Sequence, residues 1–264
     1  MSSEKIQACP PQATETAFRA AAIQSELETC VNPEKREYLP RFFKTGKGEY
    51  GEGDQFLGVV VPDVRRVAKA HKDESLAVAG CLLQSPWHEC RLCALLMLVE
   101  RFRKATSAER QEIFDFYLAH TVRINNWDLV DLSAPYIVGE YLVDKPRSVL
   151  RVLAQSSLLW ERRIAVVATH AFIRRDDFGD ILSLATFFLD TEGLILKPGA
   201  RRKTTSMHDL MQKALGWMLR EVGKRDISTL TAFLDTFSAR MPRTMLRYAI
   251  ERFSPEERKK YMGR

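Results

Sequence analysis

The chain has 264 residues, with 40 Lys and Arg against 34 Asp and Glu and a formal net charge of +6. Hydrophobic residues make up 45% of it and charged residues 28%, which excludes a disordered, collagenous or disulfide-scaffold chain. No apolar run approaches the ~18–20 residues that span a bilayer. The N-terminus is polar, without an apolar segment after a basic start, so we expect no secretory signal and a cytoplasmic protein.

Residues 1–13 contain Pro10 and Pro11 and few apolar side chains, so we predict a disordered tail there. The remaining residues, 14–264, are expected to form a single domain with an ample hydrophobic core. No coiled-coil heptad or large apolar surface stripe is evident, and we therefore expect a monomer that does not bind membranes. The modest positive charge permits an acidic partner such as nucleic acid without requiring one.

The first distinctive segment is residues 44–54, which contain four glycines and charges of both signs. It lacks the Gly-Lys-Ser/Thr ending of a phosphate-binding P-loop and the Asp spacing of a calcium loop. We interpret it as a turn that needs positive φ angles. The short β-branched run at residues 58–62 is the only strand-like segment, and Pro62 makes it a lead-in to a helix that starts near Asp63.

From Thr14 onward, apolar residues recur with a helical period. The clearest stripe lies between Trp87 and Arg103. Alternating strand patterns flanked by hairpin turns are missing, so the predicted fold class is all-α. The same helical signal returns over residues 127–142, 160–173, 210–222 and 245–253.

The predicted helices recur in pairs. Trp87 and Trp127 are 40 residues apart, and Trp127 and Trp160 are 33 residues apart. Ala165 and Ala214 open comparable stripes 49 residues apart, with a loop insertion between them. A period near 40 residues with one helix pair per repeat is typical of HEAT-like helical-repeat solenoids. We therefore expect a curved stack with a concave surface that suits a long, rod-like ligand.

The cysteines and His88 raise the question of a metal site. His88, Cys90 and Cys93 are zinc-ligand types, but they fall within an amphipathic helix pattern that has no second ligand pair. We interpret the two cysteines as small core residues and predict no metal. The chain has an odd number of cysteines, so no disulfide framework is expected. The five cysteines are Cys9, Cys30, Cys81, Cys90 and Cys93.

The most informative segment is Asn-Asn-Trp-Asp-Leu-Val-Asp at residues 125–131. On a helix, Trp127 and Asp131 are i, i+4 neighbours and present an indole and a carboxylate on one face. Asp128 lies in the first turn, where a capping role is sufficient to explain it. Asp131 lies deeper beside apolar residues, so it is either a functional carboxylate or one half of a buried ion pair, for which Arg163 is a candidate partner.

A second indole, Trp217, lies in the helix predicted over residues 210–222. Gly216 precedes it and costs about 1 kcal/mol relative to Ala within a helix, which suggests close packing or the close approach of a ligand. Taken alone, Trp217 fits a core aromatic. Arg162 and Arg163 fit either a surface or a groove.

The loop over residues 197–206 is strongly basic and leads into the next predicted helix. Its four cations beside unsatisfied helix amides would make a good phosphate anchor. A solvated, charged loop explains the same residues equally well. The cations are Lys197, Arg201, Arg202 and Lys203.

Together these segments resemble the AlkD-type DNA glycosylases, which are DNA alkylation repair enzymes built from HEAT-like repeats. The resemblance extends from about residue 34 to residue 253. Its specific parts are residues 42–58, Asn-Trp-Asp-Leu-Val-Asp at 126–131, Trp-Glu-Arg-Arg-Ile-Ala at 160–165 and Gln-Lys-Ala-Leu-Gly-Trp-Met-Leu-Arg-Glu at 212–221.

The resemblance implies that Asp131 is the catalytic carboxylate, that Trp127 and Trp217 contact the sugar of the damaged nucleotide, and that Arg163 binds the adjacent backbone. It also implies excision of positively charged N3- or N7-alkylated purines from double-stranded DNA without extrusion of the base. Asn126 stands where some relatives carry a further Trp, and this departure bears on lesion preference.

The chemistry agrees with these residue types. A cationic alkylpurine leaves as a neutral base, so the reaction needs a carboxylate to stabilise an oxocarbenium-like sugar but no general acid, metal or organic cofactor. A basic concave face suits recognition through the duplex backbone. The expected DNA-binding residues are Arg162, Arg201, Arg202, Lys203 and Lys213.

The sequence also permits two other interpretations. One is a non-catalytic HEAT-like protein that binds branched or damaged nucleic acid, although pure phosphate binding has no use for a carboxylate in the groove. The other is a protein-interaction scaffold, which would show no salt-dependent binding of DNA.

Overall fold

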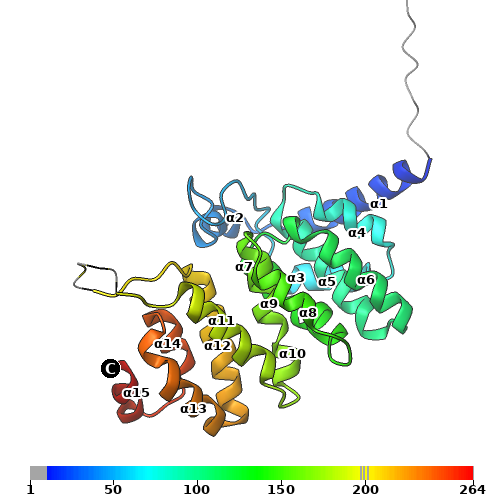
Figure 1. Ribbon diagram of the computed structural model, residues 1–264. Helices are drawn as coiled ribbons and strands as arrows, with labels where there is room; N and C mark the ends of the chain where they lie inside the picture. The colour runs from blue at the N-terminus through cyan, green and yellow to red at the C-terminus, as the bar shows by residue number, and fades with distance from the viewer. Residues whose placement is uncertain (1–10, 197, 199, 201, 264) are drawn as a thin grey trace, which may run out of the picture. The chain divides into compact units, whose positions relative to one another are not determined.

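The computed structural model describes residues 11–196, 198, 200 and 202–263. Within that part of the chain every regular element is a helix (Figure 1), and the only strand-like pairings are two isolated β-bridges. The predicted all-α class is therefore confirmed. None of the helices in the same residues is long and apolar enough to cross a membrane.

The chain, predicted as one domain over residues 14–264, forms two compact units, Met1–Leu129 and Val130–Arg264. The boundary falls within the short helix α7 (Trp127–Asp131). The elements of the first unit are α1 (Pro11–Glu28), α2 (Pro33–Phe42), α3 (Val61–Ala70), α4 (Leu76–Leu83), α5 (His88–Lys104), α6 (Ser107–Ala119) and the 3-10 turn η1 (Thr121–Arg123).

Helix α5 lies at the centre of the first unit, where α3, α4 and α6 pack against it. Its apolar residues are almost completely buried, with Leu92, Leu96 and Phe102 each 2% exposed. The predicted stripe over residues 87–103 thus matches α5 within a residue at each end. Helix α3 begins at Val61, two residues before the start predicted near Asp63, so the end of the expected lead-in is already helical.

The start of the chain differs from the prediction in one respect. Helix α1 begins at Pro11, within the tail expected over residues 1–13, and the rest of that tail, residues 1–10, lies outside the described residues. The glycine-containing segment 44–54 is a turn, as interpreted: Lys44, Gly48 and Gly53 have φ angles of 56°, 78° and 81°.

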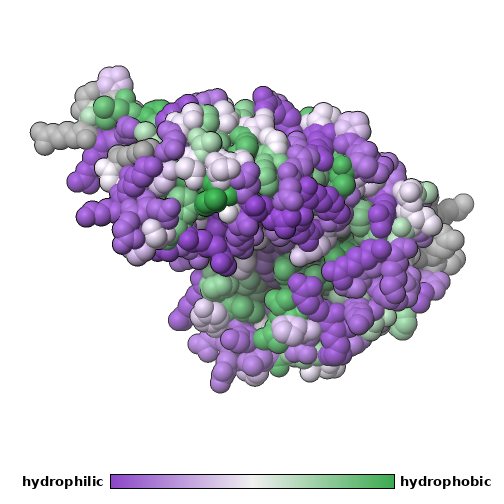
Figure 2. All heavy atoms as spheres, turned by 90° about the horizontal axis from the view of Figure 1, so that it is seen from below, coloured by the Kyte–Doolittle hydropathy of each residue, from purple (hydrophilic) through white to green (hydrophobic). Residues whose placement is uncertain are grey.

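The second unit packs around α12, which contacts α9, α13 and α14. Hydrophilic side chains cover most of the face of the molecule seen in Figure 2, with smaller hydrophobic patches among them, as expected for amphipathic helices around a core. The elements are the π-helix η2 (Pro135–Gly139), α8 (Ser148–Ala154), α9 (Leu159–Ala168), α10 (His170–Ile173), α11 (Gly179–Glu192), α12 (Asp209–Arg225), α13 (Ile227–Phe237), the 3-10 turn η3 (Ser238–Arg240), α14 (Arg243–Ala249) and α15 (Pro255–Met262).

The helical segment predicted over residues 127–142 is interrupted. Helix α7 ends at Asp131, and a π-turn follows, in which the Gly139 amide donates to the Ala134 carbonyl at 2.9 Å. Pro135 lacks the amide proton that a continuous α-helix needs at this point. Gly139 approaches helix α9 so closely that a Cβ atom would lie 2.3 Å from the Ala168 carbonyl oxygen.

The segment predicted over residues 160–173 is also divided. Helix α9 ends at Ala168 and α10 begins at His170. Between them, the Thr169 hydroxyl donates to the Val166 carbonyl at 2.6 Å, which diverts this carbonyl from a regular helical hydrogen bond.

Candidate functional site

Asp131 and Arg163, two predicted site residues, form an ion pair in the second unit. Arg163 Nε donates to Asp131 Oδ1 and Nη2 donates to Oδ2, both at 2.9 Å. The remaining guanidinium nitrogen, Nη1, donates to the Leu210 carbonyl at 2.5 Å. Every nitrogen of Arg163 therefore has an acceptor within the protein, and the Asp131 carboxylate is held in a fixed plane.

The two partners differ in accessibility. The Asp131 side chain is 15% exposed, whereas that of Arg163 is 5% exposed. A ligand can therefore reach the carboxylate more easily than the guanidinium. The ion pair anticipated as the structural explanation of Asp131 is present, and the Asp131 side chain remains partly exposed within it.

Trp217 lies on α12 in the same unit and is half-buried. Its indole Nε1 donates to Glu221 Oε1 at 3.1 Å, and its ring centroid lies 5.9 Å from that of His170. Burial, together with the charge of Arg174, lowers the pKa of His170, so this imidazole is neutral at pH 7.

Gly216 has a packing explanation. A Cβ atom at this position would lie 2.5 Å from the Met245 carbonyl oxygen and 2.5 Å from Tyr248 Cβ, both on α14. Of the two explanations that the sequence left open, the close packing of two helices is correct.

Trp127 belongs to an aromatic cluster in the first unit. Its ring stacks on Phe43 at 5.3 Å between centroids with an interplanar angle of 17°, and it meets Phe42 edge-on at 6.0 Å. Phe42 in turn stacks on Tyr38 at 5.7 Å. Tyr38 is 52% exposed and Phe42 47% exposed, so the cluster extends from Trp127 to the surface.

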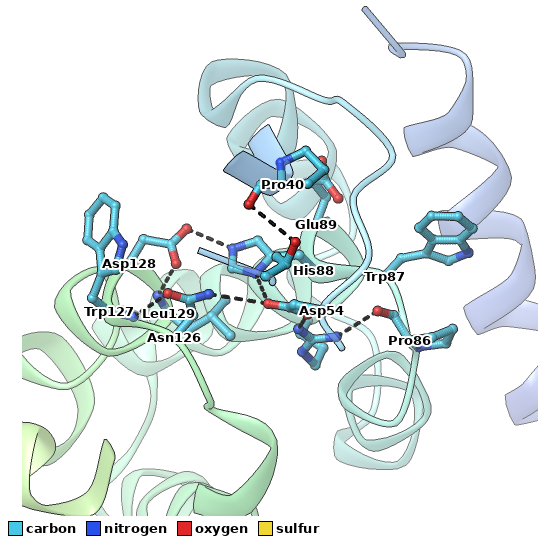
Figure 3. Close-up of polar contacts among 12 residues, drawn as sticks. Pro40, Asp54, Pro86, Trp87, His88, Glu89, Asn126, Trp127, Asp128 and Leu129 are labelled. Carbon is cyan, nitrogen blue, oxygen red and sulfur yellow. Dashed lines mark hydrogen bonds and ion pairs between the residues drawn. The ribbon is translucent and has the colours of Figure 1, made fainter. Parts of the chain in front are cut away.

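A buried polar network lies beside this cluster (Figure 3). His88, at the first turn of α5, has Asp54 Oδ2 2.9 Å from Nδ1 and Asp128 Oδ2 2.8 Å from Nε2. Asp54 has two further partners. Arg91 forms an ion pair with it, and Asn126 Nδ2 donates to Asp54 Oδ2 at 3.3 Å. Burial alone would lower the pKa of His88, but Asp128 and Asp54 outweigh it and raise the pKa to about 9.

Sequence reasoning missed this network. It assigned Asp128 to capping alone, and Asp128 Oδ1 does accept from the Leu129 amide at 2.9 Å, but its second oxygen binds His88. The sequence did contain one indication. A carboxylate has two acceptor oxygens and a helix cap uses only one of them, so Asp128 had an oxygen left for a second partner.

The zinc interpretation finds no support in the geometry. Both ring nitrogens of His88 face carboxylates, and Cys90 and Cys93 are fully buried in the core. Burial raises the pKa of the Cys90 thiol to about 11, so it is not a thiolate at neutral pH. The described residues contain no cluster of His, Cys, Asp and Glu that could hold a metal ion.

The expected DNA-binding residues differ in their surroundings. Arg162 pairs with Glu192, and Lys213 Nζ lies 2.7 Å from Asp209. Lys203 donates to the Ala239 carbonyl at 3.0 Å. Arg202 is exposed, whereas Arg201 and Lys197 lie outside the described residues.

Lys213 also lines an open groove of about 760 Å³ formed by α12, α14 and α15. Arg247, one of its cations, has no partner among the residues that the structure describes. Cations outnumber acids along the groove, which gives it a positive potential. Its charged lining residues are Lys213, Arg220, Arg247, Arg258, Asp209 and Glu251.

Comparison with known proteins shows similarity to one protein family and to solved structures. A family model described as DNA alkylation repair enzyme matches residues 23–253. Among solved structures, the chain is similar to a predicted DNA alkylation repair enzyme from Enterococcus faecalis, with a TM-score of 0.64 and 14% sequence identity over 85% of this chain and 97% of that chain. At this identity the likeness is one of fold. No curated protein matches the chain.

Proposed function

The chain belongs to the DNA alkylation repair enzyme family, and on this premise we propose that it is a DNA glycosylase that removes positively charged N3- or N7-alkylated purines from double-stranded DNA. The observation that carries the proposal is the pair of Asp131 and Arg163, which fixes the plane of a carboxylate whose side chain is 15% exposed.

The proposed reaction is a hydrolysis of the N-glycosidic bond. The bond between C1′ and the purine nitrogen breaks, its electron pair passes to the cationic base, and the base leaves as a neutral molecule. The sugar becomes oxocarbenium-like, and a water oxygen then bonds to C1′ while the water's proton passes to solvent. A fixed carboxylate lowers the barrier because it stabilises the positive charge that develops on the sugar.

In this scheme Asp131 supplies that carboxylate and orients the attacking water. Arg163 has a different role from the backbone contact that the resemblance implies. Its side chain is 5% exposed and all of its nitrogens have acceptors within the protein. We therefore assign it to positioning Asp131, since a phosphate contact would require these hydrogen bonds to break.

Trp127 and Trp217 keep the sugar-contacting roles that the resemblance implies. An indole face attracts a cationic sugar or base by about 0.5–2 kcal/mol. The edge of Trp217 is held by Glu221, and the ring of Trp127 by Phe43, so each indole has a fixed orientation.

The duplex backbone is proposed to lie along the groove between α12, α14 and α15. Its excess of cations suits phosphates, and contacts of this kind set position without reading sequence. This agrees with a repair enzyme that must act in any sequence context.

The test is single-turnover release of 7-methylguanine from a duplex oligonucleotide by the wild type and by Asp131→Asn. We expect the variant to lose at least about 10²–10³ in rate, with its affinity for undamaged duplex retained. Asp177→Asn is the matched control, because Asp177 also pairs with an arginine, Arg147, at 2.6 Å. Equal rates in wild type and Asp131→Asn would refute the catalytic role.

A second candidate function is non-catalytic binding of branched or damaged nucleic acid. The observation that favours it is the ion pair between Asp131 and Arg163. A buried arginine with a carboxylate partner is a common structural feature, and such a role would explain Asp131 without catalysis. Salt-sensitive duplex binding by the wild type without any base release would select this candidate.

A further inference from the structure

His88 lies between two carboxylates in the first unit (Figure 3). Its side chain is 2% exposed, and those of Asp54 and Asp128 are 2% and 7% exposed. A neutral imidazole carries one proton and would turn a lone pair toward one of these carboxylates. Only the doubly protonated ring donates to both, at 2.9 Å and 2.8 Å.

Arg91 on α5 pairs with Asp54, so His88 and Arg91 together face the two acids Asp54 and Asp128. The carboxylate of Glu89 is also buried, but it accepts from the backbone amides of residues 57–59. The rings of Phe43 and Phe56 lie 4.9 Å and 4.5 Å from the His88 ring and shield it from water. Loss of the proton from His88 would leave Asp128 without a cationic partner in a poorly solvated site.

Three contacts connect His88 to Trp127. Asp128, which follows Trp127 in the chain, accepts from His88. Asn126 donates to Asp54 at 3.3 Å and accepts from the Trp127 amide at 2.9 Å. Phe43 contacts both rings: it stacks on Trp127 at 5.3 Å between centroids, and it lies 4.9 Å from the His88 ring at an interplanar angle of 40°.

We propose that the doubly protonated ring of His88 is a positioning residue that holds the start of α7 and fixes the orientation of the Trp127 indole. Its consequence for catalysis rests on the proposed function, because that function gives Trp127 its contact with the sugar. The coupling between His88 and Trp127 does not depend on that function and can be measured without a substrate.

The first experiment is a pH titration by NMR of the ¹⁵N-labelled protein. The ring nitrogens of His88 are assigned with His88→Gln, and the indole N–H of Trp127 with Trp127→Phe. We expect both ring nitrogens to be protonated at pH 7.5, and the Trp127 resonance to shift with the same midpoint as His88. A neutral His88 at pH 7.5, or a Trp127 resonance that stays constant through the His88 transition, would overturn the proposal.

Asp128→Asn provides a second route if the wild type unfolds at high pH. This substitution removes one carboxylate charge, so the midpoints of both His88 and Trp127 should move together to lower pH. His71→Gln is the matched control, because His71 pairs with Glu26 at 2.9 Å and has no contact with Trp127. It should leave the Trp127 midpoint unchanged.

As the pH rises, the rate of 7-methylguanine release should fall with the same midpoint as the NMR signals of His88 and Trp127. In Asp128→Asn the midpoint of this fall should move to lower pH. Coupled NMR shifts without any base release would refute the proposed function and retain the coupling. If the rate of base release does not change through the pH range in which His88 titrates, the positioning role is refuted and the proposed glycosylase function stands.

Discussion

The carboxylate of Asp131 and the guanidinium of Arg163 meet through two parallel hydrogen bonds of 2.9 Å. This geometry holds both carboxylate oxygens at once, so Asp131 cannot rotate away from its plane without breaking the pair. Because the third nitrogen of Arg163 binds the Leu210 carbonyl, the arginine is anchored to the start of α12. The orientation of Asp131 is therefore tied to the helix that carries Trp217.

Arg163→Lys tests whether orientation of the carboxylate matters. Lysine keeps the positive charge, but a single ammonium group cannot make three hydrogen bonds in the directions that the planar guanidinium serves. We expect single-turnover release of 7-methylguanine to slow by about 10–100-fold, because small misplacements of a catalytic group have effects of this size. The affinity for undamaged duplex should change less than the rate.

A backbone contact by Arg163 would give the opposite pattern. In that case Arg163→Lys would weaken the affinity for duplex DNA. The slope of log K against log salt would become shallower by about one, as expected for the loss of one phosphate contact. Kd and its salt dependence, measured alongside the rate, separate the two roles.

Much of the fold could be predicted from the sequence, because amphipathic helices place apolar residues at a regular spacing along the chain. The apolar stripes located α5 and α12 within a few residues. The interruptions were missed because they depend on single residues: Pro135 within a helical pattern, and Gly139, whose close approach to α9 becomes apparent only in three dimensions.

The candidate site was predictable in part for a similar reason. Asp131 and Arg163 lie in neighbouring predicted helices, so an ion pair between them could be anticipated. The network around His88 joins residues 34 and 40 positions apart in the chain, from a turn, α5 and α7. No periodicity connects such positions, and a histidine in a helix gives no sign of the carboxylates that face it.

Gly216→Ala should destabilise the second unit although alanine favours helices. The added Cβ would overlap the Met245 carbonyl and Tyr248 Cβ, both at 2.5 Å, and these atoms belong to or adjoin the backbone of α14. Overpacking of this kind costs about 1–3 kcal/mol. Urea unfolding should show a lower midpoint with an unchanged m value.

Gly223→Ala in the same helix is the matched control. Its Cβ would meet the terminal methyl carbon Cδ2 of Leu230 at 2.4 Å, and this flexible end can move aside. A smaller loss than for Gly216→Ala, or a gain in stability from helix propensity, is expected. Equal losses in the two variants would show that α14 yields as readily as a side chain.

Arg247→Ala tests the groove between α12, α14 and α15. Because Arg247 has no partner among the described residues, its removal breaks no internal ion pair. We expect weaker binding to every duplex sequence and a salt slope reduced by about one, with the excision rate at saturating enzyme unchanged.

Arg225→Ala removes a cation that is paired with Asp176 at 2.6 Å and serves as the control. Its effect on duplex binding should be smaller. If both variants bind DNA as the wild type does, the backbone does not lie in this groove.

The buried network predicts how stability depends on pH. Asp128 and Asp54 raise the pKa of His88 from 6.5 to about 9 despite its burial, so the folded state binds this proton more tightly than the unfolded chain. The resulting stabilisation is fully present below pH 6.5 and is lost as the pH rises to about 9. A shift of this size corresponds to about 3 kcal/mol.

Asp54 acts in the opposite sense. Burial raises its pKa, but His88 and Arg91 outweigh burial and hold it below the usual value of 3.8. Its contribution is therefore present above pH 3.8 and is lost as the pH falls further. The network as a whole should stabilise the first unit most between about pH 4 and pH 6.5.

Urea unfolding of the wild type and of His88→Gln at several pH values between 6 and 9.5 measures how much unfolding free energy is lost as His88 gives up its proton. The difference in unfolding free energy between the two proteins should shrink steadily as the pH rises, since only the wild type has this proton to lose. Other groups that titrate in this range cancel in the comparison. A difference that stays constant from pH 6 to 9.5 would mean that His88 has the same pKa in the folded and unfolded chains, and that the two carboxylates are stabilised by Arg91 and backbone amides instead.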